Sequence, residues 1–192
     1  MVTVGVVVEG DSDKYLVESE LFRKWLREDC NLEVVGQVVN AAGNMCSRNV
    51  EDKVRLLRIE ANPDKVVVLA DLDPDGCVQC VRERKKIIGS QGIDLLTIAR
   101  KALESWFLAD TEAMCRWLGD DTFCEADPET LTGMPWDRLK ELGRKMGRGP
   151  GTKVRFSRKF IREHRFDVRR AAQHANCPSA NYFVERLCAL GN

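Results

Sequence analysis

The sequence lacks any long hydrophobic run, which limits where the protein can reside. Its longest uninterrupted apolar stretches span about five residues, far fewer than the ~20 that a membrane-spanning helix needs. The amino terminus has no basic segment ahead of an extended apolar stretch, so no secretory signal is visible. We therefore expect a cytoplasmic protein that does not enter the membrane.

Motifs for nucleotide binding and for zinc binding are also missing. No G-x-G-x-x-G follows the first predicted strand, and no G-x-x-x-x-G-K-[ST] occurs, which argues against a Rossmann dinucleotide site and a P-loop. The two histidines lie far from Cys77-x-x-Cys80, so that cysteine pair is only half of a zinc site. Because no secretory signal is visible, we expect the eight cysteines to be reduced thiols.

The net charge is zero, but the two signs are unevenly distributed. Residues 1–137 contain 16 Lys or Arg and 26 Asp or Glu, whereas residues 138–170 contain 13 and 3. An acidic body with a basic segment near its end suits an acidic metal site beside a polyanion-binding surface. Alternatively, the two parts neutralise each other by packing together, and charge balance alone does not decide between these interpretations.

Strand and helix patterns alternate over the first ~100 residues. The expected strands cover about 3–8, 32–39, 65–70 and 93–98, and the expected helices cover about 11–29, 47–61 and 77–88. This alternation predicts an α/β fold with a parallel, Rossmannoid sheet that is flanked by helices. From Ala99 the pattern becomes helical, so we expect an α/β core over 1–110 and a helical extension over 111–192 packed on it.

Carboxylates follow two of the predicted strands at the point where each strand ends. The apolar run 66–70 leads into Asp71 and Asp73, and the run 4–8 leads into Glu9. Ligands bind at the carboxyl ends of strands in open α/β sheets, so we expect these acids to meet around a divalent cation. Mg²⁺ or Mn²⁺ suits such oxygen ligands. The alternative is that acids end these strands only because loops are solvated.

Two further acids are weaker candidates. Asp13 is explained equally well as a helix-terminus residue and as an outer metal ligand, and Asp75 before a glycine indicates a turn. A calcium-binding EF-hand loop that began at Asp71 would need glutamate where Arg82 stands. It would also need a helix where the sequence predicts a strand, so we do not expect calcium.

Glu104 lies in a predicted apolar helix, where an unpaired charge would be costly. One interpretation is a local ion pair with Arg100 or Lys101, which precede it by four and three residues. The other interpretation is that Glu104 faces the metal centre, and we favour it because Leu103 and Trp106 flank the acid.

A predicted helix near the carboxyl end has a basic face. Its residues Lys153, Arg155, Arg158, Lys159 and Arg162 are candidates for contacts with the phosphates of a nucleic acid. The alternative is a solvated helix face without a ligand.

Several of these motifs resemble those of a known family. Segments 8–13 (VEGDSD) and 69–73 (LADLD) resemble motifs of the Toprim domain of topoisomerases, primases and OLD-type nucleases. Nearly the whole chain resembles a Toprim-like bacterial family of unknown function, with further shared segments at 99–110 and 177–187. The resemblance implies that Glu9 is a general acid or base and that Asp71 and Asp73 hold Mg²⁺. It also implies cleavage of DNA or RNA, in phage defence beside a separate ATPase partner.

We therefore expect a metal-dependent nuclease or related phosphoryl-transfer enzyme. Glu9 and Glu104 are the expected catalytic residues, and Glu9, Asp71 and Asp73 are the expected metal ligands. One alternative is a non-catalytic module that binds nucleic acid or a protein. Another is a phosphohydrolase that acts on a small nucleotide.

Overall fold

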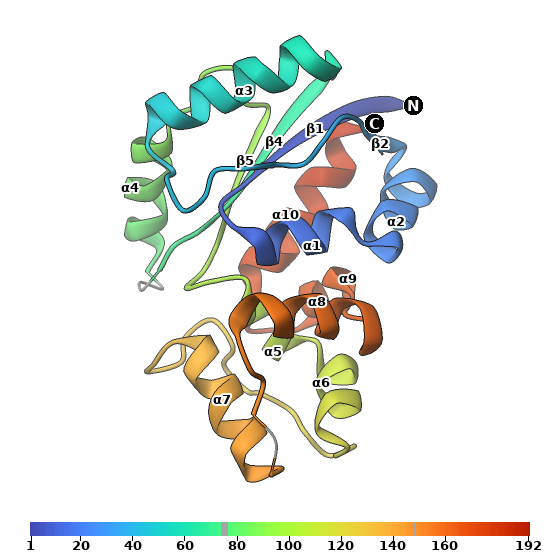
Figure 1. Ribbon diagram of the computed structural model, residues 1–192, viewed down its shortest axis with the longest axis vertical. Helices are drawn as coiled ribbons and strands as arrows, with labels where there is room; N and C mark the ends of the chain where they lie inside the picture. The colour runs from blue at the N-terminus through green and yellow to red at the C-terminus, as the bar shows by residue number, and fades with distance from the viewer. Residues whose placement is uncertain (74–76, 148) are drawn as a thin grey trace.

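The computed structural model describes residues 1–73, 77–147 and 149–192, apart from the side chain of Val78. Asp75, predicted to form a turn, lies outside these residues. Figure 1 shows a sheet flanked by helices in the upper part of the molecule and a helical lower part. The strands are β1 (Val2–Val8), β2 (Leu32–Val34), β3 (Val39–Asn40), β4 (Lys65–Asp71) and β5 (Leu95–Ala99). The helices are α1 (Asp11–Glu18), α2 (Glu20–Cys30), α3 (Ser47–Ala61), α4 (Val78–Ile88), α5 (Glu104–Ala109), α6 (Thr111–Leu118), α7 (Pro135–Lys145), α8 (Lys153–Glu163), α9 (Val168–Gln173) and α10 (Pro178–Leu190).

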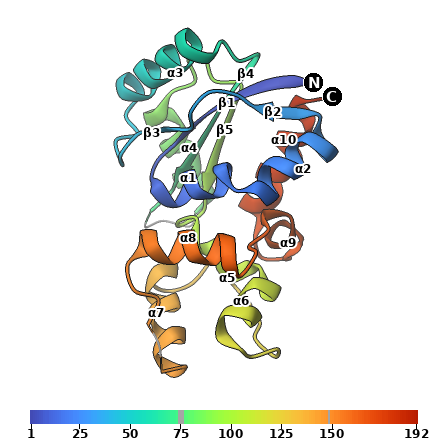
Figure 2. The same cartoon turned by 45° about the vertical axis from the view of Figure 1, so that its right-hand side comes forward.

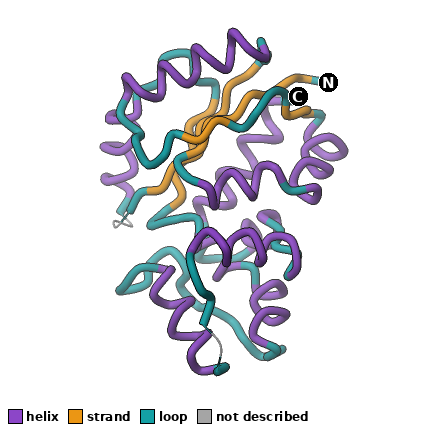
Figure 3. Tube along the Cα trace, viewed as in Figure 1, coloured by secondary structure: helices purple, strands orange, loops and turns teal. Residues whose placement is uncertain are grey.

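The predicted fold class is confirmed, because all pairings among the described strands are parallel. The strands lie in the order β2-β1-β4-β5, and β3 also pairs with β1. Val8 of β1 lies opposite Leu69 of β4, and Asp71 lies opposite Ala99 of β5. These strands, orange in Figure 3, run side by side, so their carboxyl ends reach the same edge of the sheet.

Each face of the sheet has its own hydrophobic cluster. One cluster packs α3 and α4 on the sheet, and the helical spacing of Val50, Val54 and Leu57 puts these side chains into it. The larger cluster joins the other face to α1, α2, α10 and the helical lower part, with Trp106 and Phe183 among its buried rings. The sheet is therefore covered on both faces, as continuous valine-rich strands require.

Two elements that were predicted to be continuous are interrupted. The predicted helix over 11–29 is two helices, because Ser19 has an extended backbone and its Oγ accepts a hydrogen bond from the Phe22 N–H that starts α2. The predicted strand over 32–39 is divided into β2 and β3. Gly36 lies between them with φ +69°, a conformation that favours glycine.

The helical C-terminal segment packs on the α/β part through α8, which contacts α1, and through α10, which contacts the sheet. Figure 2 shows α8 beneath α1, and the Ser157 Oγ of α8 donates to the Ser12 Oγ of α1 at 2.9 Å. Helix α10 packs on β5 and α2. The division into two domains at residue 110 stays a prediction. None of the described helices is both long and apolar enough to cross a membrane.

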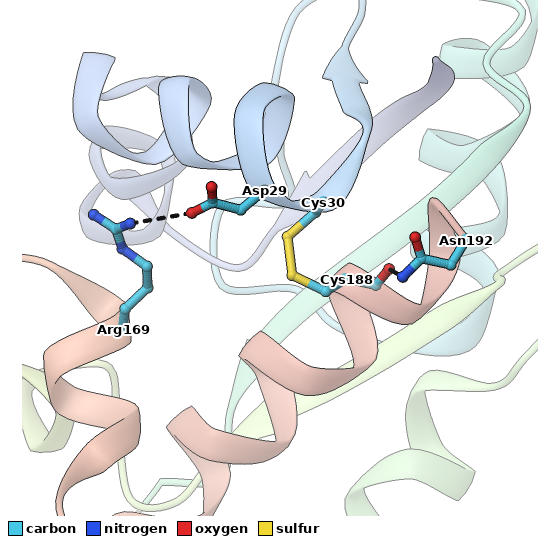
Figure 4. Close-up of a disulfide and its surroundings, with 5 residues drawn as sticks. All are labelled: Asp29, Cys30, Arg169, Cys188 and Asn192. Carbon is cyan, nitrogen blue, oxygen red and sulfur yellow. Dashed lines mark hydrogen bonds and ion pairs between the residues drawn. A yellow bond between two sulfur atoms is a disulfide. The ribbon is translucent and has the colours of Figure 1, made fainter.

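The sequence predicted that all cysteines are reduced. This prediction is wrong for four of them, which form two disulfides. Cys30–Cys188 joins α2 to α10 (Figure 4), and Cys77–Cys80 lies at the start of α4. The first bond joins residues 158 positions apart, where the chain packs closely enough that a Cβ on Gly191 would overlap the Cys30 carbonyl. Sequence spacing gives no signal for such a tertiary contact.

Asp110 connects three helices of the lower part. Its side chain is fully buried and accepts hydrogen bonds from the Ala113 N–H at 3.1 Å and the Asp167 N–H at 2.8 Å. Arg170 donates to both Asp110 oxygens at 2.8 Å. Through the Ala113 N–H, Asp110 also forms the N-cap of α6.

We expect Asp110→Ala to lower the free energy of unfolding by about 3–5 kcal/mol, because it removes the buried carboxylate that accepts from the Arg170 guanidinium and from two backbone N–H groups. Urea unfolding followed by circular dichroism measures this change. The matched control is Asp52→Ala on α3, which removes an exposed pair with Arg55 and should change stability by less than about 0.5 kcal/mol. Equal effects of the two substitutions would contradict the structural role of Asp110.

Candidate metal centre

The ends of β1 and β4 place Glu9 and Asp71 side by side. The Asp71 N–H donates to Glu9 Oε2 at 2.9 Å, and the Glu9 N–H donates to the Leu69 carbonyl at 3.1 Å. Arg84 of α4 donates from Nη2 to both Glu9 oxygens at 3.0 Å and from Nε to the Asp71 carbonyl at 3.1 Å. Parallel pairing of the two strands thus brings the acids together, and an arginine orients the glutamate.

Asp13 and Asp71 are each held by one backbone hydrogen bond. Asp13 lies in the first turn of α1, and its Oδ2 accepts from the Gly10 N–H at 3.0 Å. Its Oδ1 is buried and accepts no hydrogen bond from any described residue. Asp71 Oδ1 accepts from the Leu103 N–H at 2.9 Å. The turn after β1 and the segment before α5 therefore fix these two carboxylates.

Glu104 begins α5, and its side chain is fully buried. The Lys153 Nζ at the start of α8 lies 3.0 Å from its Oε2, whereas its Oε1 accepts no hydrogen bond within the described part of the chain. The less favoured alternative, a local ion pair of Glu104 with Arg100 or Lys101, does not form. Arg100 pairs instead with Glu129, and Lys101 donates to a backbone carbonyl, because both residues precede the helix that starts at Glu104.

The carboxylates raise one another's pKa values. Burial, followed by the charge of Glu104, raises the pKa of Asp13 to about 7. Burial, followed by the charges of Asp13 and Glu104, raises the pKa of Asp71 well above its usual range. Burial also raises the pKa of Glu104, although Lys153 opposes it. Because Glu9 contributes to the first two shifts, we call Glu9, Asp13, Asp71 and Glu104 the acidic cluster.

The same carboxylates also change the pKa of Lys153. Burial lowers the pKa of its ammonium group, but the nearby Glu104, Asp71 and Asp13 outweigh that effect and raise it. Lys153 was predicted to contact nucleic acid, and the structure directs its ammonium group into the acidic cluster. It is therefore a fixed positive charge inside the candidate site.

Asp73, the third predicted metal ligand, is exposed at the rim of the acidic cluster. Its backbone N–H donates to the Lys101 carbonyl at 2.7 Å, and its charge contributes to the raised pKa of Glu104. Among the described residues, no group of three or more His, Cys, Asp or Glu side chains is arranged to hold a metal ion. The donor set still suits a hard cation, because buried carboxylate oxygens of Asp13 and Glu104 accept no hydrogen bond from described groups.

The other predicted phosphate-binding residues form an exposed stripe along α8. They are Arg155, Arg158, Lys159 and Arg162. The opposite side of α8 buries Phe156 and Phe160 in the larger hydrophobic cluster. Because α8 starts at Lys153, the basic stripe begins next to the acidic cluster.

Sequence analysis missed Arg84, gave Lys153 a different role, and named Asp13 as either a helix-terminus residue or an outer metal ligand. The position of Asp13 in the sequence indicated that it lies near Glu9, since it occupies the first helical turn after the glycine that follows Glu9. No sequence pattern indicated the contacts of Arg84 and Lys153, because their acidic partners lie 75 and 49 positions away. A buried acid attracts a cation from any part of the chain, and spacing does not identify which one.

We expect Asp71→Asn to raise the free energy of unfolding in EDTA by about 1–2 kcal/mol, because it removes one of several repelling buried charges. The asparagine Oδ1 can still accept the Leu103 N–H. Urea unfolding at neutral pH measures the change, and Asp52→Asn on α3 is the exposed control. Destabilisation by Asp71→Asn would show that repulsion does not dominate the cluster.

Comparison with known proteins finds similarity at the level of solved structures. No family model and no curated protein matches the chain. The C-terminal region of the Burkholderia pseudomallei OLD protein is 15% identical, with a TM-score of 0.48 over 98% of this chain and 99% of that chain. The C-terminal region of the Xanthomonas campestris pv. campestris OLD protein is 17% identical, with a TM-score of 0.42 over 97% and 96%. Both are OLD proteins, as the sequence resemblance predicted, and this similarity assigns no activity and no site residue to the chain.

Proposed function

We propose that this protein is a metal-dependent nuclease or a closely related phosphodiesterase. The observation that carries the proposal is the acidic cluster, whose carboxylates come from four different segments and meet at the carboxyl edge of the sheet. A basic stripe starts beside it on α8. Carboxylates can hold a metal ion and cations can hold a phosphate backbone, and metal-dependent phosphodiester hydrolysis uses both.

Asp13, Asp71 and Glu104 would hold the metal ion, with Glu9 and Asp73 beside them. Their buried, mutually repelling oxygens fit a hard divalent cation better than any soft metal. When bound, Mg²⁺ or Mn²⁺ would stabilise charge on the transferred phosphoryl group and activate a water molecule.

Side chains of the protein would bind the phosphate group and transfer the proton. Lys153 supplies a positive charge for the non-bridging phosphate oxygens. Glu9 accepts or delivers a proton, and Arg84 orients it by contacting both of its oxygens. Glu104, which the sequence predicted to be catalytic, is assigned here to the metal ion, because its buried oxygens accept no hydrogen bond from described groups and Lys153 lies 3.0 Å from its Oε2.

The test is cleavage of plasmid DNA, single-stranded DNA and RNA in the presence of Mg²⁺ or Mn²⁺. We expect Glu9→Gln and Asp71→Asn to lower the rate about 10²–10⁴-fold while the fold is retained. Asp52→Asn on α3 is the matched control and should leave the rate unchanged. Cleavage that survives in Asp71→Asn, or that is insensitive to EDTA, would rule out the proposed centre.

A second candidate is a module that binds nucleic acid without cleaving it. The exposed basic stripe of α8 favours this function independently of the acidic cluster, since it needs no metal. A small-nucleotide phosphohydrolase would instead release phosphate from mononucleotides and leave polynucleotides intact. The narrower predictions, a separate ATPase partner and a role in phage defence, rest on the sequence resemblance.

Nucleic-acid binding is tested by the triple variant Arg155→Gln, Arg158→Gln, Arg162→Gln. We expect its slope of log affinity against log salt to be less steep by about 2–3, because each lost phosphate contact removes roughly 0.7–0.9. Fluorescence anisotropy with single-stranded and duplex DNA at several salt concentrations measures the slope. A triple control on the opposite side of the sheet, Arg48→Gln, Arg55→Gln, Lys86→Gln, should leave it unchanged. Equal slopes for wild type and the α8 variant would exclude this stripe as the binding surface.

A further inference from the structure

A cavity lies beside the outer strand β5, between α4 and α10. Its volume is about 240 Å³, and its walls come from α4, the end of β5 and α10. The hydrocarbon walls are Val81, Ile98 and Pro178, and Tyr182 adds an aromatic ring. A space of this size admits a small molecule and is too small for a polynucleotide strand.

Two cations line this cavity, and neither makes a hydrogen bond to a described carboxylate. The Arg100 guanidinium donates no hydrogen bond within the described ranges, although its side chain is only 22% exposed. Its Nε lies 3.8 Å from the Glu129 Oε2, which is an ion-pair distance. The Lys85 Nζ lies 5.0 Å from the centre of the Tyr182 ring, and no described carboxylate is within ion-pair distance of it. The guanidinium N–H groups are therefore available to an acceptor in the cavity.

The hydroxyl group of Ser179, which also lines the cavity, is already engaged. It donates to the Glu129 Oε1 at 2.5 Å and accepts from the Trp106 Nε1 and the Arg100 backbone N–H at 2.8 and 3.2 Å. Recognition in the cavity thus depends on Arg100 and Lys85. Among the described residues, Glu129 is the one carboxylate within ion-pair distance of either cation, and it pairs with Arg100, so Lys85 has no described counter-charge.

We propose that this cavity binds a small monocarboxylate with a compact hydrocarbon or aromatic body. The carboxylate would accept paired hydrogen bonds from the Arg100 guanidinium and an ionic contact from Lys85. Its single charge matches the one unbalanced cation, whereas a phosphate monoester would bring nearly two charges. The hydrocarbon body would contact the walls formed by Val81, Ile98 and Pro178.

This site is separate from the acidic cluster, and the proposal does not rest on nuclease activity. Arg100 lies one residue after β5, and its neighbours Ala99 and Lys101 accept the backbone N–H groups of Leu72 and Asp73. None of the residues that line the cavity belongs to the acidic cluster. Binding is measured without metal ion and without nucleic acid.

The experiment is isothermal titration calorimetry, with saturation-transfer NMR for weak ligands. The probes are benzoate, 3-methylbutanoate and indole-3-acetate, with benzyl alcohol as the neutral isostere of benzoate and AMP and inorganic phosphate as phosphate probes. We expect saturable binding of at least one carboxylate and at least tenfold weaker binding of the neutral isostere. Equal binding of benzyl alcohol and benzoate, binding of phosphate probes alone, or no carboxylate binding at about 10 mM would overturn the proposal.

Variants identify the cavity as the place of binding. Lys85→Gln should weaken carboxylate binding about tenfold, and Lys86→Gln, its exposed neighbour on α4, should not change it. Arg100→Gln is combined with Glu129→Gln so that no buried carboxylate loses its partner, and this double variant should lose binding. Wild-type affinity in Lys85→Gln would overturn the proposal even if the double variant failed to fold.

Discussion

Carboxylates buried at the carboxyl edge of the sheet are the constraint on which the arrangement of the chain depends. Such acids are tolerated only when positive charges face them, because desolvation of unpaired charges is costly. Here the positive charges come from distant elements. Arg84 of α4 contacts both oxygens of Glu9, and Lys153 of α8 contacts Glu104. The acidic cluster thus adds charge contacts to the hydrophobic packing that holds α4 and α8.

This requirement also explains the uneven charge along the sequence. The acidic part before residue 138 and the basic part that starts there meet in several ion pairs, and the pair of Lys153 with Glu104 is the one that lies in the acidic cluster. Contact between α1 and α8, through Ser12 and Ser157, places Lys153 there. Both explanations of the uneven charge therefore apply. Lys153 partly neutralises the acidic cluster, as packing of the two parts predicts, and the exposed stripe of α8 remains available for a polyanion.

What the sequence predicted depended on local pattern, and what it missed depended on distant contacts. The apolar runs before Glu9 and Asp71 identified the two strands and their shared edge correctly. Helical spacing suggested an ion pair between Glu104 and Arg100, but that spacing applies only inside one helix. Lys101 has φ +59°, so the chain is not helical between the two residues, and Glu104 takes its partner from α8. The break at Ser19 was similarly hidden, because apolar residues on both sides of it continue the same helical spacing.

The charge balance of the site favours a divalent ion over an internally neutralised core. The acidic cluster contains four carboxylates, while Arg84 and Lys153 supply two positive charges, so two negative charges are left when all four acids are ionised. Without a further cation the cluster reduces its charge by binding protons, which is why burial and mutual repulsion raise the pKa of Asp13 to about 7. One divalent cation would supply the missing charge and displace those protons. If the cluster served stability alone, another lysine or arginine would be expected to balance the two remaining negative charges. This charge deficit lies at the edge of the sheet where α/β proteins bind ligands, and the proposed metal-dependent function depends on it.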